Sequence, residues 1–123
     1  MARILVLDDD GDVLRLVQMR LEHEGHAVLP FSSPQKALEL VLTGDLPDLV
    51  VLDVAMPEIN GLEVLRTLRL GFGLEDLPAI FLSALVSQED IDAGRALGAT
   101  YLTKPFVASA LVKTIDKALH ARQ

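Results

Sequence analysis

Four apolar runs of this sequence each stop at residues whose side chains can take part in chemistry. In chain order, the residues at these stops are the triplet Asp8, Asp9 and Asp10, then Asp53, Ser83 and Lys104. Carboxylates without cysteine or a histidine cluster favour a hard cation, and a carboxylate set that leaves room for waters and a phosphate suits Mg²⁺. An ammonium and a hydroxyl would meet the phosphate oxygens. The residue types therefore indicate metal-assisted chemistry on a phosphoryl group.

The runs that precede these residues must bring them together, because the chain separates them widely. Residues 3–7, 49–52, 79–82 and 101–103 are short and, taken together, rich in Val, Ile and Leu. Such runs are typical of strands buried on both faces of a parallel sheet. In open α/β sheets the binding crevice lies just beyond the carboxyl ends of the strands. We therefore expect the carboxylates, the hydroxyl and the ammonium to converge at one site.

Apolar residues between the runs recur at helical spacing, which predicts the elements that connect the strands. The expected buried stripes are Leu14, Val17 and Leu21; Ala37, Leu38 and Val41; Leu62, Leu65 and Leu68; Ile91, Gly94 and Leu97; and Ala108, Leu111, Val112, Ile115 and Leu119. Gly25, Gly44 and Gly98 are the expected C-terminal caps. Ser33 and Pro34 are expected to open the second helix, with the serine hydroxyl as the N-cap.

Strand and helix patterns alternate along the whole chain. With a further strand expected over residues 26–30, five strands alternate with five helices. Strict alternation requires a parallel sheet with right-handed crossovers, and five strands are too few for an eight-stranded barrel. The predicted fold class is α/β, of the flavodoxin-like (βα)5 type, with a five-stranded parallel sheet and helices on both faces.

Length and composition limit the class of protein. The chain has 123 residues, half of them hydrophobic, which suits one domain spanning residues 1–123. It has no cysteine, and no apolar run approaches the about 20 residues of a membrane span, so we expect a cytoplasmic protein with no membrane partner. The net charge of −7 opposes direct binding to nucleic acid. The basic residues Lys113, Lys117 and Arg122 are expected on a solvated helix face.

The acidic residues are expected to differ in role. If the strands take the order usual for this architecture, the first and third strands end side by side. Asp8, Asp9 and Asp53 would then share a small volume, where a bound cation relieves the repulsion between carboxylates. Asp53 is the best candidate for a nucleophile toward phosphorus, because it ends a long buried run without an acidic neighbour. Asp10 and Asp12, near the start of the first helix, are interpreted as caps rather than metal ligands.

Five segments carry a resemblance to a known family. They are residues 4–10 (Ile-Leu-Val-Leu-Asp-Asp-Asp), 53–57 (Asp-Val-Ala-Met-Pro), 60–61 (Asn-Gly), 83–84 (Ser-Ala) and 104–106 (Lys-Pro-Phe). In this order and at this spacing the segments strongly resemble the receiver domain of two-component response regulators. The similarity spans essentially the whole chain.

The resemblance implies a role for each site residue. Asp53 would accept a phosphoryl group from a phosphohistidine on a sensor histidine kinase or a phosphotransfer protein. Mg²⁺ would be the cofactor, and its ligands would be Asp9, Asp53, the backbone carbonyl of Ala55 and, mainly through a water, Asp8. Lys104 would pair with the phosphoryl group, and its peptide bond to Pro105 would be cis.

The resemblance also implies how a signal would leave the site. Ser83 would swing toward the phosphoryl oxygens and Tyr101 would change rotamer with it. Phosphorylation would shift the population between two arrangements of the surface around the fourth helix, the last strand and the last helix, which an output domain or protein would read. A receiver is a signalling switch rather than an enzyme, although it catalyses its own phosphorylation and dephosphorylation. This chain differs from the commonest pattern in having serine rather than threonine at position 83.

Two other functions remain open from the sequence. Asp8 and Asp10 form an Asp-x-Asp after the first strand, as in phosphohydrolases of the haloacid dehalogenase type, which use the first Asp as the nucleophile. In that case Asp8 rather than Asp53 would take up the phosphoryl group. The second alternative is a degenerate receiver that binds its partner constitutively. Its partner binding would not change when Asp53 is replaced by Asn.

Overall fold

The computed structural model describes residues 2–54, 56, 60–84 and 87–121. Over these residues five strands alternate with five α-helices, as the sequence predicts. The elements are β1 (Arg3–Leu7), α1 (Gly11–His23), β2 (Ala27–Phe31), α2 (Pro34–Leu42), β3 (Leu49–Asp53), α3 (Gly61–Arg66), the π-helical turn η1 (Thr67–Gly71), β4 (Ala79–Ser83), α4 (Gln88–Ala96), β5 (Thr100–Thr103) and α5 (Ala108–Ala121). No helix within the described ranges has both the length and the apolar character needed to cross a membrane.

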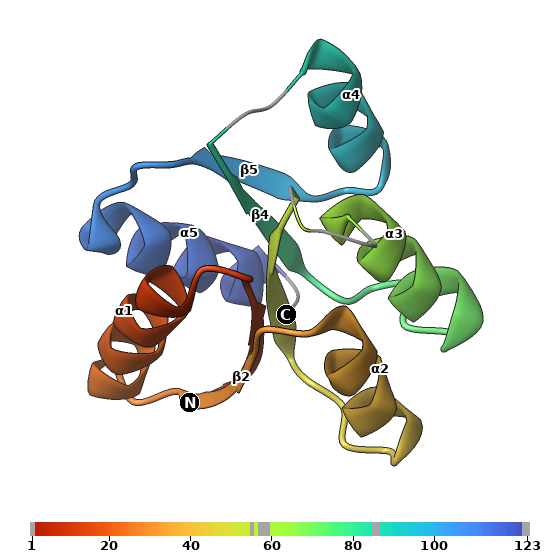
Figure 1. Ribbon diagram of the computed structural model, residues 1–123, viewed down its shortest axis with the longest axis horizontal. Helices are drawn as coiled ribbons and strands as arrows, with labels where there is room; N and C mark the ends of the chain where they lie inside the picture. The colour runs from red at the N-terminus through yellow and green to blue at the C-terminus, as the bar shows by residue number, and fades with distance from the viewer. Residues whose placement is uncertain (1, 55, 57–59, 85–86, 122–123) are drawn as a thin grey trace.

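All five strands pair in parallel, in the order β2-β1-β3-β4-β5. Helices α1 and α5 cover one face of the sheet, and α2, α3 and α4 cover the other (Figure 1). The predicted α/β class, with a five-stranded parallel sheet and helices on both faces, is therefore confirmed. This strand order also places the ends of β1 and β3 side by side, as the argument for a shared site requires.

Each central strand contributes to two cores, because successive side chains of a strand point to opposite faces. Leu5 and Leu7 of β1 belong to the cluster under α2 and α3. Ile4 and Val6 belong to the cluster under α1 and α5. All four side chains are at most 1% exposed. Burial on both faces explains why the strand sequences are continuously apolar rather than alternating.

The predicted helix starts are confirmed in part. The carboxylate of Asp10 accepts hydrogen bonds from the backbone N–H groups of Asp12 and Val13, at 3.0 and 3.4 Å, so its capping role is confirmed. Ser33 and Pro34 occupy the cap and first positions of α2 as expected, but the Ser33 hydroxyl makes no cap hydrogen bond, so that part of the prediction is wrong. The predicted C-terminal caps are confirmed by positive φ angles at Gly25, Gly44 and Gly98.

The strand register brings the functional residues to one edge of the sheet. Leu7 at the end of β1 lies opposite Leu52 of β3, and Asp53 lies opposite Leu82 of β4. Because all strands run in the same direction, the residues that follow them emerge at the same edge. Ser83 is the last residue of β4 and therefore ends at this edge as well.

Candidate functional site

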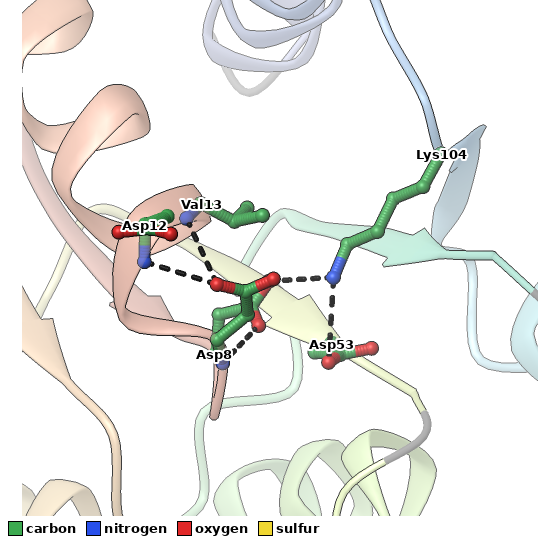
Figure 2. A network of polar contacts seen from close by, with 6 residues as sticks. Asp8, Asp12, Val13, Asp53 and Lys104 are labelled. Carbon is green, nitrogen blue, oxygen red and sulfur yellow. Dashed lines mark hydrogen bonds and ion pairs between the residues drawn. The ribbon is translucent and has the colours of Figure 1, made fainter.

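A buried ion-pair cluster lies at the carboxyl edge of the sheet. The Lys104 ammonium donates a hydrogen bond to Asp8 Oδ2 at 2.8 Å, and its Nζ lies 3.5 Å from Asp53 Oδ2. Figure 2 shows the lysine side chain reaching from just beyond the end of β5 toward both carboxylates. The Asp8 and Asp53 side chains are 1% and 6% exposed, and that of Lys104 is 17% exposed. Residues that lie up to 96 positions apart in sequence are thus in contact.

The local backbone holds Asp8 in place. Its N–H group donates to the carbonyl of Phe31, which extends the pairing of β1 with β2 by one residue. Its Oδ1 accepts a hydrogen bond from the N–H group of Asp10 at 2.9 Å. The other oxygen, Oδ2, accepts from Lys104. Asp8 is therefore fixed as a hydrogen-bonded carboxylate rather than left as an unpaired buried charge.

The carboxylates of Asp8, Asp9 and Asp53 offer oxygens that all lie within 4.8 Å of one another. An octahedral Mg²⁺ ion holds its ligands at about 2.1 Å, so that opposite oxygens are roughly 4 Å apart, and the cluster needs only a small contraction to surround such an ion. With all three carboxylates ionised and Lys104 protonated, two negative charges remain uncompensated, which matches a divalent cation. The donor set therefore fits Mg²⁺. Ala55, the expected carbonyl ligand, lies outside the described residues.

Lys104 is held in the charged form by its surroundings. Burial on its own would lower the pKa of Lys104, but the hydrogen bond and charge of Asp8, together with Asp53, outweigh that effect, and the pKa is raised above its usual value. The ammonium is therefore present at any physiological pH. The backbone N–H group of Lys104 donates to the carbonyl of Ser83 at 2.9 Å, and the peptide bond to Pro105 is cis, as expected. The lysine is thus anchored to the strand that carries the serine.

Ser83 and Tyr101 are not among the residues that form the ion pairs with Lys104. Ser83 is fully buried at the end of β4, the strand next to the one that carries Asp53. Tyr101 is partly buried on β5, with its ring centroid 5.1 Å from that of Phe81 and the two rings tilted by 34°. The expected switching roles of Ser83 and Tyr101 remain predictions. Ser83 ends the strand beside the one that ends at Asp53, whereas the Tyr101 ring lies against Gly94 of α4.

Gly61 allows α3 to approach the end of β3 closely. Its N–H group donates to the carbonyl of Val54 at 3.1 Å. A Cβ atom at this position would overlap the Asp53 carbonyl oxygen and would lie 3.3 Å from Cε1 of Phe81. Only glycine fits here without displacing the backbone of Asp53. Asn60 caps α3, because its side-chain oxygen accepts a hydrogen bond from the N–H group of Glu63. The close approach and the cap explain why Asn60 and Gly61 occur together in the sequence.

Sequence reasoning missed an apolar cleft of about 760 Å³ beside the site. The cleft is lined by α1, by the segment around the start of α5 and by Ala84, which follows β4. The other lining residues include Val13, Leu16, Met19, Lys104, Phe106 and Leu111. Leu16 and Met19 are 68% and 63% exposed, whereas the residues of α1 that are buried in the core are Val17 and Leu21. The sequence could have indicated this cleft, because Leu16 and Met19 are apolar but do not belong to the buried stripe of that helix.

Comparison with known proteins shows which family this chain resembles. The family model described as the response regulator receiver domain matches residues 4–116. An uncharacterised 14.6 kDa protein in the sodA1 3' region of Leptolyngbya boryana is 41% identical over 93% of this chain and 87% of its own length. The response regulator SaeR of Staphylococcus aureus is 34% identical over 97% of this chain, which spans 51% of that protein.

The fold comparison agrees with the sequence comparison. The chemotaxis protein CheY4 of Vibrio cholerae superimposes with a TM-score of 0.87 and 29% identity, covering 96% of this chain and 98% of that one. The chain matches this structure over nearly its full length, but it spans only about half of SaeR. The family model's match over residues 4–116 includes all three carboxylates of this chain's acidic cluster.

Proposed function

The chain belongs to the response regulator receiver family, and from that premise we propose that it is a phosphorylation switch in which Asp53 accepts a phosphoryl group from a protein phosphohistidine. The observation that carries the proposal is the Lys104 ammonium, which lies between Asp8 and Asp53 in a cluster that fits Mg²⁺. Phosphoryl transfer to a carboxylate requires a carboxylate nucleophile with positive charge placed beside it. The proposed donor is a sensor histidine kinase or a phosphotransfer protein.

The proposed reaction uses residues already in position. A carboxylate oxygen of Asp53 attacks the phosphorus atom of the phosphohistidine. The P–O bond forms as the P–N bond breaks, and the electron pair of the broken bond stays on the imidazole nitrogen, which then takes up a proton. Lys104 transfers its hydrogen bond from Asp53 to a phosphoryl oxygen while Asp8 continues to orient its ammonium. Bound Mg²⁺ would supply further positive charge to the phosphoryl oxygens.

The other site residues have supporting roles in the proposal. Asp9 and Asp53 would hold the metal directly, with the Ala55 carbonyl, and Asp8 would act mainly through a water. The Ser83 hydroxyl would bind a phosphoryl oxygen, and Tyr101 would change position with it. The change would alter the surface of α4, β5 and α5, which an output domain or protein would read. The share of SaeR that this chain does not match leaves room for such a domain in that relative.

The phosphohydrolase alternative is weakened by the position of Asp10. In that alternative Asp10 would act as the acid and base beside a nucleophilic Asp8. Its carboxylate instead accepts hydrogen bonds from the first turn of α1, while Asp8 is paired with Lys104. Both aspartates are thus occupied in ways that do not suit the hydrolase roles.

Uptake of one phosphoryl group from a small donor tests the proposed function. Phosphoramidate with Mg²⁺ should add a single phosphoryl group to the wild-type chain, seen in the intact mass. Hydroxylamine should remove it, because acyl phosphates react with this nucleophile. A chain that remains unmodified, or one whose modification resists hydroxylamine, would contradict the proposal.

Asparagine in place of Asp9 should weaken Mg²⁺ binding without unfolding the chain, because Asp9 is exposed and its carboxylate is one of three in the cluster. Loss of one charged ligand is expected to reduce the affinity roughly tenfold or more. Calorimetric titration of Mg²⁺ measures the change. The matched control is Asp76→Asn, another exposed aspartate that lies outside the cluster, and it should leave the affinity unchanged. Equal affinities for both variants would remove Asp9 from the metal site.

The apolar cleft between α1 and the start of α5 offers a docking surface for the protein donor. Lys104 and Ala84 line both the cleft and the edge of the site, so a protein that presents a phosphohistidine to Asp53 would rest against it. Exposed Leu16 and Met19 would then be covered. We propose that this cleft binds the donor protein.

Leu16→Asp tests the cleft. The variant should lose most phosphoryl transfer from a phosphotransfer protein that phosphorylates the wild-type chain, since a charge in an apolar contact costs about 2 kcal/mol or more. Uptake from phosphoramidate should be unchanged, because a small donor needs no docking surface. Leu70→Asp is the control, since Leu70 is 79% exposed and lies on η1, away from the cleft. Equal loss in the two variants, or loss with both donors, would contradict the docking role.

A further inference from the structure

Arg69 joins three parts of the fold at the edge of the sheet opposite the acidic cluster. It lies on η1, the turn that continues α3, and its guanidinium donates hydrogen bonds to two backbone carbonyls. Nη1 donates to Leu97, which directly follows α4, and Nη2 donates at 2.8 Å to Leu77, two residues before β4. One side chain therefore connects η1, the end of α4 and the entry to β4.

The carbonyl of Leu97 belongs to a helix end. The last carbonyls of an α-helix have no N–H group of the same helix to accept from, and they carry the negative end of the helix dipole. An arginine that donates to such a carbonyl caps the helix, because its positive charge also faces that end of the dipole. Here the cap comes from a different element, since Arg69 and Leu97 are 28 positions apart in sequence.

Partial burial strengthens these hydrogen bonds. Burial lowers the pKa of Arg69, while the negative charge of Asp76 opposes this shift. A charged group that has lost part of its hydration gains more from each hydrogen bond, because the local dielectric is lower than that of water. The turn after α4 also packs on the guanidinium, since a Cβ atom at Gly98 would lie 3.5 Å from Nη1.

Helix α4 has little apolar burial of its own. Among the residues of α4 whose burial the structure describes, Gly94 alone is buried, and it has no side chain to pack. Ile91, the only large apolar residue among them, is partly buried. In contrast, α3 buries Leu62, Val64 and Leu65. Because few apolar groups hold α4 on the sheet, its polar attachment at Leu97 carries more of the task.

We propose that Arg69 is a clamp that holds the C-terminal end of α4 on the sheet, and that its loss lets α4 detach while the rest of the fold persists. This inference goes beyond the proposed function, because it concerns the unphosphorylated chain. Arg69 belongs to η1 and not to α4, β5 or α5. A residue outside the surface formed by these three elements thus decides whether α4 stays within it.

Trypsin cleavage after Arg95 reports whether α4 has detached. Arg95 lies exposed in the last turn of α4, but a protease must bind several residues on each side of the bond in extended form. Cleavage therefore requires the helix end, including Leu97, to leave the sheet. In unphosphorylated protein, Arg69→Met should speed this cleavage roughly tenfold or more, because a charged hydrogen-bond donor is lost. The masses of the products over time give the rate at each site.

Arg66→Met is the matched control for this substitution. Arg66 is an exposed arginine of α3, three positions before Arg69, so its replacement removes the same charge and leaves the clamp in place. Its cleavage rate after Arg95 should equal that of the wild type. Equal rates in Arg69→Met, Arg66→Met and the wild type would overturn the proposal.

The order of cleavage separates detachment of α4 from general unfolding. In Arg69→Met the bond after Arg95 should be cut first, ahead of the bonds after Lys36 in α2 and Lys113 in α5. Those two helices remain folded when α4 alone detaches. Cleavage at all three sites together would overturn the proposal, because Arg69 would then stabilise the whole fold rather than α4. The experiment needs no phosphoryl donor, so its result does not depend on whether Asp53 is phosphorylated.

Discussion

Asparagine in place of Asp53 is expected to reduce phosphoryl uptake from phosphoramidate by roughly a thousandfold or more, because the amide lacks the nucleophilic oxygen that the reaction uses. The fold should persist. Lys104 keeps its 2.8 Å hydrogen bond to Asp8 in the variant, and one of three crowded negative charges is removed. The measurement is the rate of appearance of the phosphorylated mass in wild type and variant at equal Mg²⁺ concentration.

Asp116→Asn is the matched control for this substitution. Asp116 is an exposed aspartate on α5, so its amide form removes one negative charge without touching the acidic cluster. Its phosphoryl uptake should equal that of the wild type. Uptake by Asp53→Asn at the wild-type rate would mean that another group is the nucleophile. Partner binding that does not change in Asp53→Asn, despite phosphorylation of the wild type, would favour the degenerate receiver.

Methionine in place of Lys104 should lower the free energy of unfolding by about 3 kcal/mol in Mg²⁺-free buffer, because the carboxylate of Asp8 loses its partner while it stays buried. Asp8 is 1% exposed, so water cannot replace the ammonium. Added Mg²⁺ should restore part of the loss, since a cation in the cluster neutralises the same carboxylates. Phosphoryl uptake should fall roughly tenfold or more, because a positive charge near the transferring group is gone.

Urea unfolding with and without Mg²⁺ measures the stability change in Lys104→Met. The control is Lys117→Met, which removes an exposed lysine of α5 and should change stability by less than about 0.5 kcal/mol. If the two variants unfold at the same urea concentration, the ammonium of Lys104 does not compensate the buried acids. If Mg²⁺ stabilises the wild type but leaves Lys104→Met unchanged, the cation and the lysine do not share the cluster.

The convergence of the site was predictable because it follows from the direction of the strands. Continuous burial of the apolar runs implies a parallel sheet, and a parallel sheet brings every strand end to one edge. Asp8, Asp53 and Lys104 could therefore be placed together although the chain separates them widely. The neighbouring position of β1 and β3, in contrast, came from the order usual for this architecture, since no single residue specifies which strands pair.

Element boundaries were less predictable, because pairing decides them. Strand β2 was expected over residues 26–30 but spans Ala27–Phe31, so it starts and ends one residue late. Phe31 lies opposite Leu7, and this pairing extends the strand beyond Pro30. Proline is tolerated because β2 is an edge strand whose outer side needs no N–H donor. A propensity argument treats proline as the end of the strand and misses the partner.

Contacts between elements were the least predictable part of the site. In the sequence Gly94 is one member of a helical stripe, and Tyr101 is one residue of a short strand. Their contact depends on how α4 sits on the sheet and on the space left beside Phe81. The cleft position of Leu16 and Met19 was also unpredictable. The sequence pattern identifies the buried face of α1 but not the cleft that this helix forms with the start of α5. Such features arise from packing and not from local periodicity.

Identification of the phosphorylated residue tests the central claim most directly. After reaction with phosphoramidate and Mg²⁺, borohydride reduction converts an aspartyl phosphate to homoserine, and peptide mass spectrometry locates the converted residue. The account predicts conversion at Asp53 alone, in proportion to the phosphoryl group taken up. Conversion at Asp8 or Asp9, with Asp53 intact, would contradict it.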